Sequence, residues 1–511
     1  MNAHYDVAVV GGGAGGTYAA WRLQTGSGSE SSVLPADPAQ RVIGLFELSD
    51  RIGGRLESLV PPEMENLRAE FGAMGFTSND TLVNKIVAYF GLATEPFPHG
   101  GLSNLLYLRG VRFTNKQATD PTFTPPYQLP ASDKAVDPRS LIPNAIEKVF
   151  PGCDKWTQQQ WDKVTSQPWN GRNLGDMGFW NFLLLNMTNE EFSYARDAYG
   201  HFFEVANWNC AEALPWFMLD GHATYTTLAN GYDQLPITLA KAFVAGGGQL
   251  LMSTPVASVQ NVTTGPQGQS TLEITTADGQ TCTADAVILA LPRRSLELID
   301  SNVLAPVQEL VASVTGQRCM KVFCCYTEDW WQQLGITAGS TGTDLPLGQV
   351  WYFGPDSASN PNSLLLATYD DTLDTSFWEG LSSGPRFPSG NGSVDPHWVE
   401  QATSTYMVDE IQRQLGFVHG IAIPQPYGAS WRDWSEDPYG GAFNTWNVGV
   451  DADTVAQQIL QPDSSINLYV CGEAYSHDQG WVEGAFDTAE EVVERIGLDA
   501  PVWHTAAVNA V

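Results

Sequence analysis

The sequence of 511 residues is 43% hydrophobic and 11% aromatic, which is enough apolar material for two or three domains. Its 57 aspartates and glutamates outnumber 25 lysines and arginines, and the formal charge of -32 argues against nucleic acids and anionic membranes as partners. High solubility is the simplest consequence of this charge, and a preference for cationic substrates is another.

The cysteines and the apolar segments exclude further classes of protein. There are seven cysteines, an odd number without a CxxC pair, so the sequence indicates neither a disulfide scaffold nor a zinc site. No apolar segment reaches the ~18 residues that a membrane span needs. The first predicted strand begins at Tyr5 and leaves no room for a signal peptide, so we expect a cytoplasmic location.

The chain begins with an apolar run that leads into a glycine-rich turn. Residues 5–10 predict a strand, and Gly11, Gly13, Gly15 and Gly16 follow it directly before a helix-forming segment. Such a turn suits a dinucleotide pyrophosphate, because glycines admit the phosphates to the backbone and the helix N-terminus offers free N–H groups. Alone it is weak support in a chain with 49 glycines, where an ordinary strand-to-helix turn is the alternative.

A second apolar run, over residues 41–46, ends at Glu47, whose carboxylate would reach the ribose hydroxyls of the nucleotide. The gap from Gly16 to Glu47 exceeds the usual ~20 residues. We interpret the Ser- and Pro-rich residues 26–40 as an inserted surface loop that accounts for the difference.

The loop over residues 51–55 follows and contains Arg51, Gly54 and Arg55. Arginines beside glycines suit a second clamp on the pyrophosphate, with close approach of the backbone to a flat ring. The combination of this loop with the glycine turn resembles FAD proteins more than NAD dehydrogenases.

Three separated segments have the pattern of one nucleotide-binding domain. Strands are expected at residues 248–252, 271–275, 285–290 and 467–471, and a helix follows the last of them to about residue 496. We therefore expect an α/β fold with a discontinuous nucleotide domain. The expected division is residues 1–60, 230–320 and 456–511 for FAD binding, residues 131–229 for a helical domain, and residues 61–130 and 321–455 for a mixed-sheet substrate domain.

Motifs over nearly the whole chain resemble those of flavin-dependent amine oxidases, most of all the L-amino-acid oxidase branch. Beyond the N-terminal motifs they are residues 68–74 (RAEFGAM), 106–110 (LYLRG), 230–236 (NGYDQLP), 343–346 (TDLP), 472–475 (GEAY) and 480–485 (GWVEGA). The resemblance implies a Rossmann-like FAD domain of the GR2 type. It also implies non-covalent FAD, because Ala442 stands where some monoamine oxidases attach FAD through a cysteine. The FAD contacts that it adds are Gly72, Ala73, Met74, Val256, Gly472, Glu473, Gly480, Trp481 and Val482.

Lys321 is the predicted catalytic residue. It lies in an apolar run, and its spacing to Trp330 and Trp331 resembles that of the family's lysine, which holds a water beside flavin N5. A buried lysine must be paired, hydrated or shifted in pKa. Its positive charge would favour electron transfer to O2. The alternative is a lysine that reaches solvent from a strand.

The C-terminal motif is expected to complete the site. Glu473 would meet the ribityl or pyrophosphate region of FAD, and the helix that opens at residues 480–482 would stabilise negative charge on the reduced ring. The resemblance makes Trp481 and Phe443 two walls of an aromatic cage that orients the amine. It also places the hydroxyl of Tyr352 near the substrate carboxylate, in a register that is uncertain by one residue. Core packing is the alternative role for each aromatic residue.

The chain departs from the resemblance at Gly75, which is a predicted substrate contact. L-amino-acid oxidases that it resembles carry an arginine here, and that arginine pairs with the substrate carboxylate. A carboxylate buried without a cation is costly, so either another base replaces the arginine or the substrate lacks a carboxylate. The candidate substitutes, each with an ordinary structural role as the alternative, are Arg109, Arg112 and Arg318.

The expected reaction is that of an oxidase. Hydride leaves the α-carbon of an L-amino acid for flavin, the imine hydrolyses to a 2-oxo acid and ammonia, and O2 becomes H2O2. A primary amine or polyamine is the alternative substrate; a flavin desaturase or isomerase, or a nucleotide-binding protein without catalysis, is less favoured. The expected partners are an amine or amino acid and O2, without nucleic acid, metal or membrane. The sequence leaves open whether the chain forms a homodimer.

Overall fold

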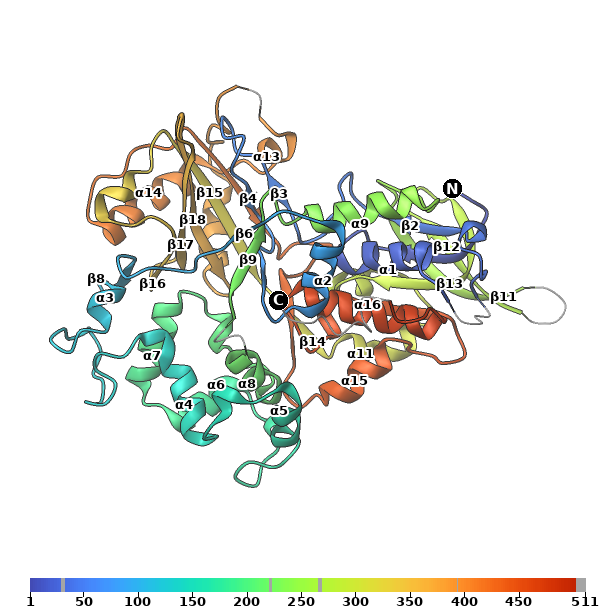
Figure 1. Cartoon of the computed structure of the whole chain (residues 1–511), viewed down its shortest axis with the longest axis horizontal. Coiled ribbons are helices and arrows are strands. Elements are labelled where there is room, and N and C mark those ends of the chain that lie inside the picture. The colour runs from blue at the N-terminus through green and yellow to red at the C-terminus, as the bar shows by residue number, and fades with distance from the viewer. Residues whose placement is uncertain (29–32, 220–222, 265–268, 393, 502–511) are drawn as a thin grey trace.

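The computed structural model of the chain describes residues 1–28, 33–219, 223–264, 269–392 and 394–501. Figure 1 shows three regions: an α/β region that contains the N-terminus, a mixed sheet, and a cluster of helices beside both. The predicted α/β fold with a mixed-sheet region and a helical insertion is confirmed. The exact domain boundaries stay predictions.

The first sheet joins segments from three parts of the chain. It contains β1 (His4–Val10), β2 (Ile43–Phe46), β10 (Gln249–Leu251), β11 (Val256–Thr264), β12 (Gln269–Thr276), β13 (Thr281–Ala290) and β21 (Leu468–Cys471). The order is β10-β2-β1-β13-β12-β11, with β21 beside the end of β13. Strands β10, β2, β1, β13 and β21 are parallel, and the central pair sets Val10 opposite Leu289.

Helices cover both faces of this sheet, which explains why its parallel strands are almost continuously apolar. Val7 and Val9 pack with α1 (Ala14–Thr25), α9 (Gln234–Ala245) and α16 (Val482–Ile496), which lie side by side in Figure 1. Ala8 and Val10 face the opposite way, because side chains alternate along a strand. They pack with α10 (Arg293–Leu298), α11 (Gln308–Val311) and α15 (Ala452–Ile459).

The second sheet is antiparallel apart from its β16–β7 pair. Its order is β19 (Gly428–Asp433), β15 (Cys319–Tyr326), β18 (Asn360–Asp371), β17 (Gln349–Ser357), β16 (Gly339–Thr343), β7 (Leu105–Leu108) and β8 (Val111–Thr114). Helix α14 (Thr405–His419) packs on one face. All eight residues of β15 are buried, and its Lys321 pairs with Tyr369 of β18.

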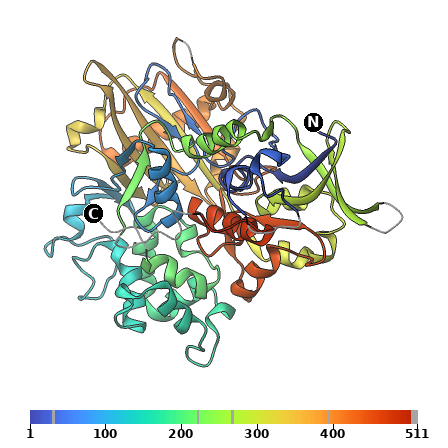
Figure 2. The same ribbon diagram turned by 45° about the vertical axis from the view of Figure 1, so that its right-hand side comes forward.

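The helical cluster consists of α4 (Leu141–Val149), α5 (Gln158–Thr165), α6 (Phe179–Asn186), α7 (Asn189–Tyr199) and α8 (Cys210–Leu219), around an aromatic core of its own. Figure 2 shows it below the two sheets. Three small sheets complete the chain: β3 (Ser58–Leu59) with β4 (Ala69–Glu70), β14 (Val314–Gln317) with β20 (Phe443–Trp446), and β5 (Phe76–Thr77) with β9 (Tyr225–Leu228) and β6 (Thr94–Pro96). The remaining α-helices of the described residues are α2 (Thr81–Phe90), α3 (Asn115–Ala118), α12 (Thr375–Ser382) and α13 (Pro396–Glu400). Within the described residues, none of the helices has the length and apolar character to span a membrane.

Candidate active site

Two adjoining cavities lie where the three regions meet. The first has a volume of about 310 Å³ and follows the glycine turn, and the second has a volume of about 740 Å³ and lies between the second sheet and the helical cluster. We call them the cofactor cavity and the inner cavity. Ala73, Tyr369, Phe443 and Trp481 line both. Ligands in the two cavities would therefore meet at these residues.

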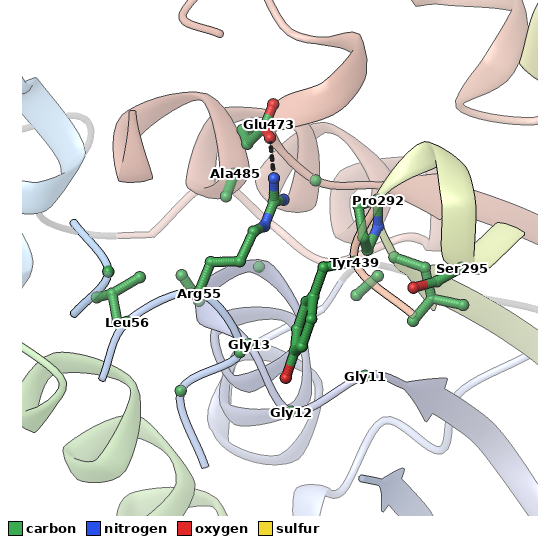
Figure 3. A pocket seen from close by; sticks show the side chains of 18 of the residues that line it. Gly11, Gly12, Gly13, Arg55, Leu56, Pro292, Ser295, Tyr439, Glu473 and Ala485 are labelled. Atoms are coloured by element: carbon green, nitrogen blue, oxygen red, sulfur yellow. Dashed lines mark hydrogen bonds and ion pairs between the residues drawn. The ribbon is translucent and has the colours of Figure 1, made fainter. Parts of the chain in front are cut away.

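The glycine turn forms one end of the cofactor cavity (Figure 3). Gly11 has a φ of +108°, and a β-carbon there would lie 2.5 Å from the carbonyl oxygen of Ala290. Helix α1 begins after Gly13 without a side-chain cap, so the first-turn N–H groups are available to a phosphate. Gly11, Gly13 and Gly15 line the cavity. Gly16 does not; a β-carbon there would lie 1.8 Å from the oxygen of Gly11, so this glycine permits the tight packing of helix on turn.

Glu47 lies at the end of β2, in the wall of the cofactor cavity. Its carboxylate accepts hydrogen bonds from the backbone N–H of Gly12 at 2.7 Å and of Ser49 at 2.8 Å. These bonds hold the side chain at the edge of the cavity, and its contact with a ribose stays a prediction.

Arg55 and Glu473, which both line the cofactor cavity, form an ion pair (Figure 3). Arg55 also donates to the carbonyl oxygen of Ala442 at 3.0 Å, and Asn444 donates to Glu473 Oε1 at 3.0 Å. The other carboxylate oxygen, Oε2, is buried and has no partner among the described residues. A buried oxygen without a partner needs a donor, and the hydroxyls of an FAD ribityl chain are donors of that kind. The residues present therefore fit FAD.

The structure corrects the role expected of Arg51. Its guanidinium forms an ion pair with Glu57 at 3.1 Å and donates to the carbonyl oxygens of Gly54 at 2.6 Å and Leu56 at 3.1 Å. Arg51 does not line the cofactor cavity. It stabilises the loop that brings Gly54 within reach of the glycine turn, where a β-carbon on Gly54 would lie 3.1 Å from the Cα of Gly13.

The other predicted cofactor contacts fall at the two cavities. Gly72, Ala73, Val256, Gly472, Gly480 and Val482 line the cofactor cavity, and Met74 lines the inner cavity instead. Ala442 lines the cofactor cavity, as does Cys319. Burial raises the pKa of the Cys319 thiol well above its usual range. A thiol that stays protonated is a poor nucleophile, which is in keeping with non-covalent cofactor binding.

Lys321 does not reach solvent. Its side chain is 2% exposed, and Nζ donates to the backbone carbonyl oxygens of Glu70 at 3.0 Å and Gly72 at 2.5 Å. The Nζ atom lies 4.4 Å from the ring centroid of Tyr369, its cross-strand partner. Burial lowers the pKa of Lys321 to about 8. The alternative of a solvent-exposed lysine is therefore excluded, and the amine lines the cofactor cavity.

Phe443 and Trp481 lie at the junction of the two cavities. A β-carbon on Gly480 would lie 3.7 Å from the Phe443 ring, so the backbone next to Trp481 passes close to that ring. Trp481 is also the N-cap of α16, which has no side-chain cap. The structure thus brings the two predicted aromatic walls together with an open helix N-terminus.

The inner cavity contains polar groups that the sequence motifs did not indicate. Its aromatic walls include Phe97, Tyr199, Phe203, Trp208, Trp216, Phe217, Tyr225, Trp351 and Tyr369. Its ionisable groups are His99, Asp137, Arg139, His201 and Glu204. No local pattern marks the ionisable residues, since they come from loops and short helical turns between the first two nucleotide-binding segments.

Gly75 lines the inner cavity, but its backbone leaves no room for a side chain. A β-carbon there would lie 2.4 Å from the carbonyl oxygen of Thr226, because β5 pairs with β9 immediately after Gly75. None of the three arginines named as substitutes lines either cavity. Arg109 pairs with Glu190, Arg112 donates to the carbonyl oxygens of Phe417 and Val418, and Arg318 pairs with Glu379. The arginine of the inner cavity is Arg139.

Tyr352 also lies outside both cavities. Its hydroxyl is 2.9 Å from Thr341 Oγ1 and 2.6 Å from Nε2 of His419, which belongs to α14. Trp351 points to the opposite face of the sheet and lines the inner cavity, since neighbouring residues of a strand face opposite sides. The strand register therefore places the tryptophan, rather than the tyrosine, on the side of the inner cavity.

Comparison with known proteins identifies similar chains over almost the whole length. The family described as flavin containing amine oxidoreductase matches residues 39–497. Aplysianin-A of Aplysia kurodai is 26% identical over 96% of this chain and 89% of its own length. Achacin of Lissachatina fulica is also 26% identical, over 96% and 92%, and an L-amino-acid oxidase of Mus musculus is 24% identical, over 96% and 70%.

Two solved structures share the fold. A double mutant of putrescine oxidase superposes with a TM-score of 0.69 at 16% identity and covers 96% of this chain and 99% of its own. Cyclohexylamine oxidase from Brevibacterium oxydans IH-35A gives a TM-score of 0.67 at 16% identity, with the same coverage. At this identity the similarity concerns the fold alone.

Proposed function

The chain belongs to the flavin-containing amine oxidoreductase family, and on this basis we propose that it oxidises L-α-amino acids with O2. Family membership confirms two predictions, namely a flavin cofactor and an amine-oxidising enzyme. The choice of an amino acid over a simple amine depends on whether the inner cavity has a partner for a carboxylate.

Arg139 is the candidate partner for a substrate carboxylate. It lies in the short turn η2 (Pro138–Ser140), which Asp137 caps by accepting a hydrogen bond from the Arg139 backbone N–H at 3.0 Å. Among the described residues no carboxylate forms an ion pair with its guanidinium, whose side-chain contact is a long one of 3.5 Å to Asn115 Oδ1. A guanidinium without a counter-ion in an aromatic-walled cavity suits a carboxylate ligand. Arg139 would thus replace the arginine that Gly75 excludes.

The remaining residues have roles that follow from their positions. Bound FAD would supply the acceptor for the hydride of the substrate α-carbon and the route of its electrons to O2. Phe443 and Trp481 would hold the amine at the junction of the cavities and exclude water. Lys321 holds a proton at Nζ beside the cofactor cavity, and the N-terminus of α16 adds positive potential.

The test is Arg139→Met, assayed by H2O2 release with L-norleucine and with pentylamine, its decarboxylated analogue. Loss of a charge-assisted pair of about 1.5–3 kcal/mol should lower kcat/KM for norleucine about 10- to 100-fold relative to pentylamine. Arg139→Lys should restore part of the difference, because it keeps the charge but not the planar fork. Arg109→Met is the matched control, since that guanidinium pairs with Glu190 outside both cavities.

An equal loss for norleucine and pentylamine would remove Arg139 from substrate recognition. A wild-type enzyme that oxidises pentylamine but no L-amino acid would establish the alternative, an oxidase of primary amines or polyamines.

A further inference from the structure

Glu204 lies in the wall of the inner cavity, and among the described residues no lysine or arginine forms an ion pair with it. We propose that its carboxylate binds a second cationic group of the substrate, distant from the α-amine. Basic L-amino acids such as L-lysine and L-ornithine are then the preferred substrate class. This inference rests on the proposed function for the α-carboxylate and adds a site for the other end of the molecule.

The backbone around Glu204 is held in place. Glu204 belongs to η5 (Phe203–Val205), and the N–H groups of Phe202 and Phe203 donate to the carboxylate of Asp371 at 2.8 and 3.1 Å. Asp371 ends β18, the strand that carries Tyr369. The ring of Phe203 meets the cage residue Phe443 with centroids 4.6 Å apart. Glu204 is thus the next residue after Phe203, which contacts the predicted aromatic cage.

The carboxylate of Glu204 is mostly buried, with a side-chain exposure of 13%. Its basic neighbour in the described part of the chain is His201, whose Nδ1 lies 3.6 Å from Glu204 Oε1. No lysine or arginine among the described residues forms an ion pair with it. A buried carboxylate without a full counter-charge is costly, so a cationic ligand would be stabilised here.

The hydrogen-bond geometry of His201 fits a neutral ring, which would not balance the charge of Glu204. Nδ1 lies 3.3 Å from Nε2 of Gln349, an amide nitrogen that only donates, so Nδ1 is assigned as the acceptor of a neutral ring. Nε2 then carries the hydrogen, and this atom is buried without a partner in the described residues. His201 is 6% exposed and lines the inner cavity. Glu204 lines the same cavity, and its carboxylate is therefore the acceptor that this part of the wall offers to an ammonium group.

The surroundings of Glu204 also favour a cation over an anion or a neutral group. Tyr199, Trp216 and Tyr369 line the same cavity, and aromatic faces attract ammonium groups. The formal charge of -32 would raise the local concentration of cationic substrates. Arg139 and Glu204 then act on opposite charges of one substrate, the α-carboxylate and the side-chain ammonium.

The experiment compares L-lysine with L-norleucine, which has the same side chain without the terminal ammonium. The holoenzyme is assayed by H2O2 release, and the result is the ratio of kcat/KM for the two substrates. We expect the wild type to favour L-lysine by about 10-fold or more, and Glu204→Gln to lower this ratio about 10- to 100-fold. Glu204→Asp should retain part of the preference because it keeps the charge. Glu190→Gln, which removes the same charge from an exposed pair with Arg109, should leave the ratio unchanged.

The possible failures are distinguishable. If both amino acids are oxidised but Glu204→Gln leaves the ratio unchanged, the role of Glu204 is overturned while the proposed function stands. If no amino acid is oxidised, the proposed function fails, and 1,4-diaminobutane is compared with butylamine instead. A diamine preference that Glu204→Gln removes would then support the cation site, and the absence of that preference would overturn it.

Discussion

A β-carbon at Gly75 would lie 2.4 Å from the carbonyl oxygen of Thr226. This contact explains why an arginine does not stand at a position where similar L-amino-acid oxidases are expected to have one. The strand pair β5–β9 passes too close, so the carboxylate partner has to come from another element. Arg139, which belongs to the turn η2, lines the same cavity as Gly75.

Substitution of Gly75 should therefore damage the enzyme rather than improve it. Gly75→Ala is expected to destabilise the fold by about 1–3 kcal/mol, because the backbone of β9 must move. Gly75→Arg should not lower KM for L-amino acids. Urea unfolding gives the first quantity and H2O2 kinetics the second. Gly354→Ala is the control, since nothing lies within 4 Å of a β-carbon there; equal stability of the two alanine variants would contradict the steric explanation.

Lys321→Met should retain bound FAD but slow the reaction of the reduced enzyme with O2 by about 10-fold or more, since one fixed charge stabilises a developing anion by a few kcal/mol. Visible absorbance measures the flavin content, and stopped-flow mixing with O2 measures the rate. A variant with normal flavin content and a normal rate would remove Lys321 from the mechanism. Loss of flavin alone would assign the lysine to cofactor binding.

The pH dependence of the reaction with O2 should reflect the ionisation of Lys321. Because burial lowers the pKa of Lys321 to about 8, Nζ is charged below that pH and neutral above it. The rate of reaction with O2 should fall as pH rises through about 8, and Lys321→Met should lack this decline. The same shift acts on stability with a defined sign. The unfolded chain binds the extra proton between about 8 and the ordinary value of 10.5, so this group makes unfolding less favourable as pH rises through that window.

The buried ion pair between Arg22 and Glu490 should hold α1 to α16. Arg22 Nε and Nη2 donate to the two oxygens of Glu490 at 2.9 and 2.7 Å, and both side chains are at most 6% exposed. Glu490→Ala should lower the free energy of unfolding by about 3–5 kcal/mol, because a buried guanidinium loses its carboxylate. Glu410→Ala, at a pair whose Arg413 is 58% exposed, should cost about 1 kcal/mol or less. Urea titrations compare the two, and similar losses would contradict the importance of burial.

Glu473→Gln should weaken FAD binding. The substitution removes the charge opposite Arg55 and the buried oxygen that lacks a partner, at a cost of about 1.5–3 kcal/mol, or about 10- to 100-fold in Kd. Titration of apoprotein with FAD, followed by flavin fluorescence, measures this change. Glu190→Gln serves as the control for lost charge, and unchanged affinity in Glu473→Gln would separate Glu473 from the cofactor.

Much of the fold and of the cofactor site could be predicted because the signals are local. The run from Tyr5 to Gly16 contains its own strand, turn and helix start. Glu47 follows an apolar strand that is parallel to the first, so the carboxyl ends of the two strands lie side by side. Arg51 shows where such reasoning stops. The arginine suits a phosphate as well as a carboxylate, and Glu57 together with the carbonyl oxygens of Gly54 and Leu56 holds its side chain away from the cavity.

By itself, the sequence determined the α/β fold, the discontinuous nucleotide-binding segments and the family, because strand periodicity, glycine turns and motif spacing are written along the chain. The tertiary structure alone decided that Lys321 is buried, that Trp351 rather than Tyr352 faces the inner cavity, and that Gly75 excludes a side chain. It also brought Arg139 and Glu204 into one cavity. Burial, strand facing and charge pairing depend on which distant segments meet, and no local pattern specifies those contacts.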